Sequence, residues 1–228
     1  MPVVYYEMSE KSDWVKHRDG LWIQQRKRVY LYWFKFLQEA ESSDEFDVDW
    51  MRYRGWGGSN YVLGVKFDEF WEERWKDLFG VKKRSDKPKF PISTKQPKAE
   101  GIRLSLLCWQ KRNSPSLQPN QKSNLTGVAK AVYEYELGIS GEKKERYAMG
   151  GYGASDLNPT PEKIKDKLAA TGEYFDRKGV EDLSDEEEQK EYALAARKEL
   201  QNHIRKQIHR YLRNARRYMT NVSVGQFP

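Results

Sequence analysis

The chain has 228 residues, enough for one large domain or two small ones, and 33% of them are charged against 38% that are hydrophobic. Soluble domains carry about 25% charged residues, so we expect the aromatic residues, which make up 14%, to build much of the core. A single cysteine excludes an intramolecular disulfide, and no apolar run is long enough to indicate a membrane span. Because its start also lacks a secretory signal, we predict a cytoplasmic protein of the reducing, intracellular compartment.

The net charge is +7, and the positive excess lies in two segments. Residues 200–228 contain six arginines and lysines and no acid, and residues 80–98 contain seven against a single acid. The rest of the chain is therefore slightly acidic. Clustered charge creates a local field, whereas scattered lysines mainly confer solubility. The C-terminal segment and residues 82–98, which we call the basic loop, are therefore candidate binding surfaces.

The N-terminal part is predicted to form tryptophan-rich helices. Apolar residues at helical spacing predict one helix over residues 21–40 and another with Asp68 as its N-cap and Gly80 as a left-handed C-terminal residue. The glycines of "GWGG" predict a break between the two helices. Prolines and lysines predict an extended loop over residues 81–97, and a further helix opens near Pro97. Four tryptophans follow the helical period and are assigned to the core: Trp22, Trp33, Trp71 and Trp75.

The polar stretch 113–124 is predicted to be a linker, since it is rich in serine, asparagine and proline. It would separate a Trp-rich helical domain, residues 1–112, from a second helical domain, residues 125–228. The expected fold class is therefore mainly α-helical, with a helical, aromatic-rich N-terminal half and a helical C-terminal half.

The C-terminal half is predicted to contain further helices. Residues 125–137 favour a helix over a strand, and another helix begins at Thr160. Ser184 and Glu187 have the spacing of a capping box, and the helix that they open runs about 35 residues toward the end of the chain.

On a helical wheel, this last helix has an apolar face and an opposite cationic face. The apolar face contains Leu200, Ile204, Ile208, Tyr211, Leu212, Ala215 and Met219. The opposite face, which we call the basic ridge, contains Lys206, Arg210, Arg213 and Arg217. Arg205, His209 and Arg216 flank the ridge on one side.

A solvated helix face is the simplest interpretation of the basic ridge. Acids at the start of a helix and cations at its end suit the helix dipole, at about 0.3–1 kcal/mol each, but this accounts for one or two charges per end. Like charges three or four residues apart repel by a few tenths of a kcal/mol, and a polyanion would relieve that repulsion. The guanidinium group also binds two phosphate oxygens at once, which favours a nucleic-acid interpretation.

We therefore expect a non-enzymatic nucleic-acid-binding protein, with duplex DNA favoured over RNA, that contacts phosphates through the basic ridge and the basic loop. The candidate contact residues are Lys206, Arg210, Arg213, Arg217, Arg205, Arg216 and Asn214 in the helix, with Lys82, Lys83, Arg84, Lys87, Lys89, Lys95 and Lys98 in the loop. Tyr218 and Phe227 flank the basic helix and are candidates for stacking on bases.

Two alternatives stay open. An interaction or assembly protein would place the basic ridge on an acidic protein partner, with residues 222–228 docking as an extended tail, and a homo-oligomer is compatible with either function. A nuclease would use Asp47 and Asp49 with the lysines of the basic loop. However, the chain has no metal-site spacing and no phosphate-binding glycine motif, so we expect no metal, no cofactor and no enzymatic activity.

Overall fold

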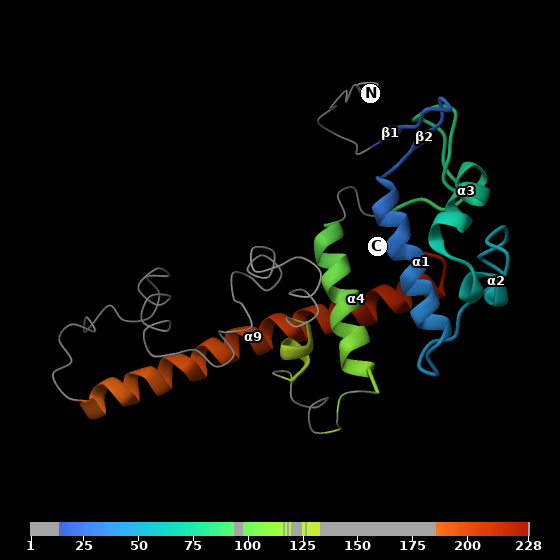
Figure 1. The fold of residues 1–228 in the computed structure, drawn as a ribbon. Helices are drawn as coiled ribbons and strands as arrows, with labels where there is room; N and C mark the ends of the chain where they lie inside the picture. The colour runs from blue at the N-terminus through green and yellow to red at the C-terminus, as the bar shows by residue number, and fades with distance from the viewer. Residues whose placement is uncertain are drawn as a thin grey trace. The chain divides into compact units, whose positions relative to one another are not determined.

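The computed structural model describes residues 14–93, 98–115, 117, 119, 125, 127–132 and 186–227, and the side chains of 186–201 and 203 lie outside this description. The chain divides into two compact units: Met1–Leu106 together with Asn214–Pro228, and Leu107–Arg213. The fold is mainly helical, as predicted, and ends in a long helix (Figure 1). The predicted linker at 113–124 and the domain bounds beside it stay predictions.

The first unit begins with a short hairpin. Strand β1 (Val15–Lys16) pairs antiparallel with strand β2 (Trp22–Ile23), and helix α1 (Lys27–Glu41) follows. The prediction that this helix starts near residue 21 was wrong. The backbone N–H and C=O of Trp22 both bond to Val81, at 2.8 and 2.9 Å, so pairing between distant segments overrides the helical spacing of the Trp22 side chain. Trp22 itself is only half-buried.

Helix α1 carries the centre of an aromatic core, as the sequence predicts. Trp33, Phe36 and Leu37 have no exposed surface, and Trp71 and Trp75 of the next long helix are also buried. The Trp33 ring contacts rings from four other segments of the first unit: Trp56, Phe79, Phe90 and Phe227. Burial of large rings from segments so far apart in the sequence holds this unit together.

A glycine turn separates α1 from the following helices, as predicted. Gly55, Gly57 and Gly58 all have positive φ angles, between 85° and 99°. A Cβ atom on Gly57 would lie 2.5 Å from the ring of Tyr61, so no larger residue fits there. The turn leads into a short helix that the sequence did not predict, α2 (Ser59–Gly64).

Helix α3 (Phe67–Leu78) has the predicted position but different ends. Its N-cap is Lys66, and Asp68 lies in the first turn, where its carboxylate forms a 2.7 Å ion pair with Lys27. Gly80 does not adopt a left-handed conformation, so the prediction that it ends this helix as a left-handed residue was wrong. A Cβ atom there would lie 2.8 Å from the carbonyl oxygen of Lys76, so glycine is required by close packing rather than by φ.

Helix α4 (Ala99–Asn113) begins two residues after Pro97, and its apolar side chains are buried on most sides, as predicted. Residues 125 and 127–132 are helical where the structure describes them. The predicted helix start at Thr160 and the capping residue Ser184 lie outside the described residues.

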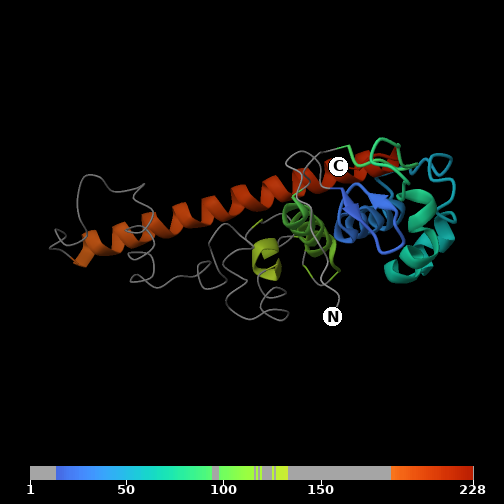
Figure 2. The same ribbon diagram turned by 90° about the horizontal axis from the view of Figure 1, so that it is seen from above.

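The last helix, α9 (Glu186–Ser223), is 38 residues long and confirms the long C-terminal helix (Figure 2). It ends in a Schellman motif: Gly225 has a φ of 75°, the N–H of Gln226 bonds to the carbonyl of Asn221, and the N–H of Gly225 bonds to that of Val222. The motif satisfies carbonyl groups that the helix end would otherwise leave unpaired.

Candidate nucleic-acid interface

Helix α9 presents the basic ridge to solvent. Lys206, Arg210, Arg213 and Arg217 are all exposed, as are the flanking residues Arg205 and Arg216, while Asn214 is half-buried. The opposite face is buried, with Ile204, Ile208, Leu212, Ala215 and Met219 each at most 5% exposed, and the side chain of Leu200 lies outside the description. The predicted division of this helix into an apolar face and a cationic face is therefore confirmed where side chains are described.

The ridge cations are not neutralised by the acids that the structure describes. Arg216, beside the ridge, forms a 3.2 Å ion pair with Glu45, and Arg205 also has an interaction partner. Within the described ranges, Lys206, Arg210, Arg213 and Arg217 form no ion pair. Three arginines spaced three and four residues apart thus repel one another on a single helix face.

Tyrosine rings support two of the ridge arginines. The guanidinium carbon of Arg210 lies 5.4 Å from the ring centre of Tyr211, and that of Arg217 lies 5.3 Å from the ring centre of Tyr218. Both tyrosines are buried, so each guanidinium lies beside a ring that is packed against the protein. Such contacts restrict where the two guanidinium groups can lie.

The prediction that Tyr218 and Phe227 are available to stack on bases was wrong. Tyr218 is 8% exposed and Phe227 is fully buried, where its ring stacks on that of Trp33 at 5.6 Å. The same burial corrects the expectation that residues 222–228 dock on a partner as an extended tail. Phe227 packs in the core of its own unit.

The basic loop is held to the aromatic core rather than free in solvent. Pro88, Phe90 and Ile92 are buried, while the residues between them are exposed, as in one edge of a sheet. The N–H of Phe90 donates to the carbonyl of Leu78, and the N–H of Ile92 donates to the side chain of Gln24. This alternation directs Lys87 and Lys89 outward. Lys82, Lys83 and Lys98 are exposed as well, and Lys95 lies outside the described residues.

Arg84 differs from the lysines of the basic loop. Its guanidinium carbon lies 3.9 Å from the ring centre of Trp22, and the side chain is half-buried. The loop also closes a tight turn here, since Asp86 accepts a hydrogen bond from the N–H of Lys83 and returns one from its own N–H to the Lys83 carbonyl. Arg84 therefore acts as an anchor of the loop as well as a cation.

Residues 92–93 of the basic loop and the segment that follows α9 lie side by side in the first unit (Figures 1 and 2). Ile92 and Phe227 form a parallel bridge, and the N–H of Ser93 donates to the carbonyl of Phe227 at 3.0 Å. Of the predicted helix residues, Asn214, Arg216 and Arg217 belong to this unit with the loop, whereas Arg205, Lys206, Arg210 and Arg213 belong to the second unit.

The proposed nuclease carboxylates do not form a metal site where the structure describes them. Both carboxylate oxygens of Asp49 already accept hydrogen bonds within the protein, one from the N–H of Met51 and the other from the Arg52 guanidinium. No three His, Cys, Asp or Glu side chains among the described residues are placed to hold a metal ion. In the same ranges, no helix combines the length and the apolar character that crossing a bilayer requires.

Sequence reasoning missed the residues that hold the basic loop in place. The alternation in "KPKFPIS", residues 87–93, was the available signal, since period-two burial is typical of an extended segment on a core. The role of Gln24, which bonds to Ile92 across 68 residues, has no comparable local signal. Comparisons of the chain with protein-family models, with curated proteins and with solved structures found no match.

Proposed function

We propose that this chain is a non-enzymatic nucleic-acid-binding protein that contacts the phosphates of duplex DNA through the basic ridge and the basic loop. The observation that carries the proposal is the row of exposed arginines on one face of α9, which form no ion pair with the acids that the structure describes. Phosphates would relieve their mutual repulsion and accept the paired N–H groups of each guanidinium.

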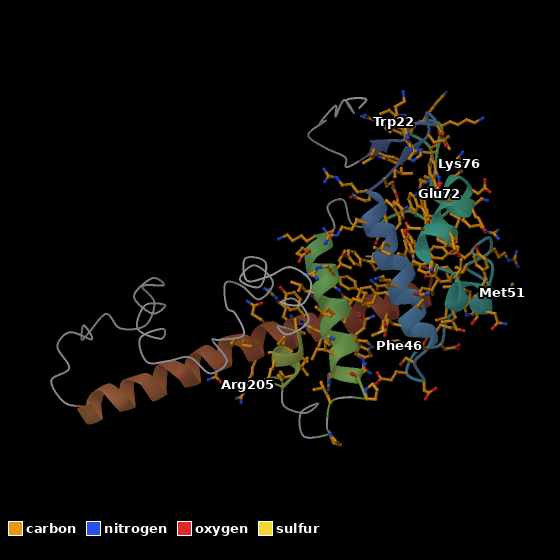
Figure 3. All side chains as sticks on the ribbon, in the orientation of Figure 1. Trp22, Phe46, Met51, Glu72, Lys76 and Arg205 are labelled. Atoms are coloured by element: carbon orange, nitrogen blue, oxygen red, sulfur yellow. The ribbon has the colours of Figure 1, made fainter. Side chains whose placement is uncertain are left out.

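The burial of the aromatic rings favours a duplex over a single strand. Proteins that bind single strands stack bases on exposed aromatic side chains. The large hydrophobic residues that are exposed in the described ranges are aliphatic: Met51, at the outer edge of the first unit in Figure 3, Leu63 and Val224. Among the described residues the aromatic rings are buried or half-buried, whereas many cations are exposed, which suits contact with a phosphate backbone.

The helical form of the ridge favours DNA over RNA. The major groove of B-form DNA admits an α-helix, whereas the major groove of an A-form RNA duplex is deep and narrow. Arg210 and Arg213 have the side-chain chemistry to reach base edges as well as phosphates, and Asn214 beside them is half-buried. We assign sequence preference, where the chain has one, to Arg210 and Arg213.

The test is fluorescence anisotropy with labelled duplex DNA, single-stranded DNA and duplex RNA over a series of salt concentrations. We expect tightest binding to duplex DNA, with log K falling by about 0.9 per phosphate neutralised for each tenfold rise in salt. Replacing Arg210, Arg213 and Arg217 together with Glu is expected to abolish binding.

The matched control replaces Lys35, Arg54 and Lys66 with Glu, because these three cations are also exposed but lie outside both cationic segments. Its change in net charge is identical, so a general charge effect would weaken both variants equally. Circular dichroism checks that α9 remains helical. Equal affinity of the ridge variant and the unmodified chain would contradict the proposal.

An acidic protein partner is the second outcome that the same experiment separates. The ion pair between Arg216 and Glu45 is an example of carboxylate recognition beside the ridge. If no polynucleotide binds at low salt, and a pull-down recovers one protein in a stoichiometric amount that nuclease does not release, the ridge is an assembly surface instead.

A further inference from the structure

Residues 224–227 form a short segment after α9 that we call the C-terminal strap. Gly225, with a φ of 75°, turns the chain out of the helix, and its Cα packs closely on Arg52, because a Cβ atom would lie 3.1 Å from the Arg52 Cβ. The strap then runs back to the core of the first unit and ends at Phe227.

Phe227 seats the strap in the aromatic core. Its ring has no exposed surface and lies 5.6 Å from the ring of Trp33, 6.0 Å from that of Phe36 and 5.7 Å from that of Tyr218. Tyr218 lies in the last turns of α9, and its ring centre is 5.3 Å from the guanidinium carbon of Arg217. The Phe227 ring therefore packs against the same Tyr218 ring that contacts the guanidinium of Arg217.

The other edge of the strap holds the basic loop. Phe227 pairs with Ile92, and its carbonyl accepts the N–H of Ser93. Lys87 and Lys89 precede this pairing, and their outward direction depends on the burial of Pro88 between them and of Phe90 and Ile92 after them. A segment with so few backbone bonds of its own takes its conformation from such anchors.

We infer that the C-terminal strap is a positioning element, which couples the basic loop to the end of α9 so that both contact one duplex. This inference rests on the proposed function. With the strap seated, the loop lysines are ordered before binding, and the nucleic acid does not have to order them. With the strap released, the ridge still binds, but the loop adds little.

A double-mutant cycle on the full chain tests the coupling. One change replaces Lys82, Lys83, Lys87 and Lys89 with Gln, and the other is Gly225→Ala, which strains the strap at a positive φ and against Arg52. In the unmodified chain, loss of the loop lysines is expected to weaken duplex binding by about tenfold or more, as for several lost phosphate contacts. In the Gly225→Ala background, the same loss is expected to be under about twofold, and the salt slope to be already shallower.

Matched variants separate positioning from stability. Gly20→Ala strains a glycine with a φ of 81° in the hairpin turn, where nothing lies near the new Cβ atom, and it should leave the loop's contribution intact. Phe227→Ala should act like Gly225→Ala, and Phe227→Leu should restore part of the loop's contribution. Circular dichroism and tryptophan emission identify any variant that does not fold. If Phe227→Ala does not fold, the double-mutant cycle is interpreted from Gly225→Ala alone.

The outcomes distinguish the two proposals. Absence of binding by the unmodified chain would overturn the proposed function and this inference with it. Binding with strictly additive losses, so that the loop lysines contribute equally in both backgrounds, would overturn the inference and leave the proposed function standing. Loss of the loop's contribution in Gly225→Ala but not in Gly20→Ala would support both.

Discussion

The basic loop and the basic ridge expose cations by different physical means. The ridge lies on a regular helix, in which every residue direction follows from 3.6 residues per turn, and its buried face alone fixes which side chains point outward. The loop forms few backbone bonds of its own, and Lys87 and Lys89 point outward because Pro88, Phe90 and Ile92 point inward. Damage to the core should therefore disorder the loop while the ridge keeps its geometry.

The largest effect that we expect comes from Phe90→Ala. The ring of Phe90 contacts Trp33, Tyr53 and Trp56, so its loss leaves a cavity among large rings and should cost about 3–5 kcal/mol of unfolding free energy. Urea denaturation followed by tryptophan emission measures it. Lys89→Ala, at the exposed neighbouring position, is the control and should stay within about 0.5 kcal/mol. Similar losses in both variants would show that the loop is not held through Phe90.

Tyr53→Phe tests how the end of α9 is attached to the core. The Tyr53 hydroxyl donates to the carbonyl of Val222 and accepts the indole N–H of Trp33, and burial raises its pKa well above the ordinary value. Removing it leaves buried polar groups unpaired, at a cost of about 1–3 kcal/mol. Tyr61→Phe removes a hydroxyl that bonds to Glu73 at the surface and should cost clearly less. Equal costs would show that the helix end does not depend on this bond.

Arg84→Ala should release the loop with little damage to the core. Its contact with Trp22 is worth about 0.5–1 kcal/mol at a partly exposed site, so global stability should fall only slightly. Limited trypsin digestion should nevertheless cleave faster after Lys89. Lys83→Ala serves as the control, because it removes an exposed cation and leaves the backbone N–H that bonds to Asp86. No change in cleavage would assign the loop's conformation to Phe90 and Ile92 alone.

Glu100→Gln concerns arginines that are paired, in contrast to the ridge. Partial burial raises the pKa of Glu100, but the hydrogen bond and charge of Arg103, together with Arg28, outweigh it and hold the pKa below its ordinary value. A lowered carboxyl pKa stabilises the fold above the ordinary pKa of about 4.5, and this contribution is lost as the pH falls through the folded value. Since the pair is half-exposed, we expect a loss below about 1 kcal/mol at pH 7. Thermal melts between pH 3 and pH 7 measure it, and a loss that stays constant down to pH 3 would contradict the assignment.

The smallest effect has the opposite sign. Arg213→Gln removes one of the mutually repelling ridge cations and should raise stability by about 0.2–0.5 kcal/mol at low salt, with no gain at high salt. Gln is also a good helix former, so helix propensity changes little. Melting temperatures of both chains at two salt concentrations measure the difference. Destabilisation at low salt would show that Arg213 has an acidic partner.

The sequence by itself determined the features that depend on local periodicity. The helical class, the approximate positions of α1, α3 and α4, the aromatic core and both faces of α9 all follow from apolar spacing, because a regular helix converts sequence spacing directly into direction. The cationic ridge was visible for the same reason. Its binding role stays a proposal, since charge alone does not select between a polyanion and solvent.

Only the tertiary structure decided the features that depend on partners distant in the sequence. Trp22 leaves the predicted helix because Val81 pairs with it, Gly80 is needed because the Lys76 carbonyl lies against it, and Phe227 is buried because Trp33 and Ile92 receive it. The outcomes for Trp22 and Phe227 are set by contacts with residues far along the chain, and that for Gly80 by the Lys76 carbonyl four residues before it and by the distant Leu21 side chain. A local pattern contains no record of such contacts, because their free energy appears only when the chain has folded around them.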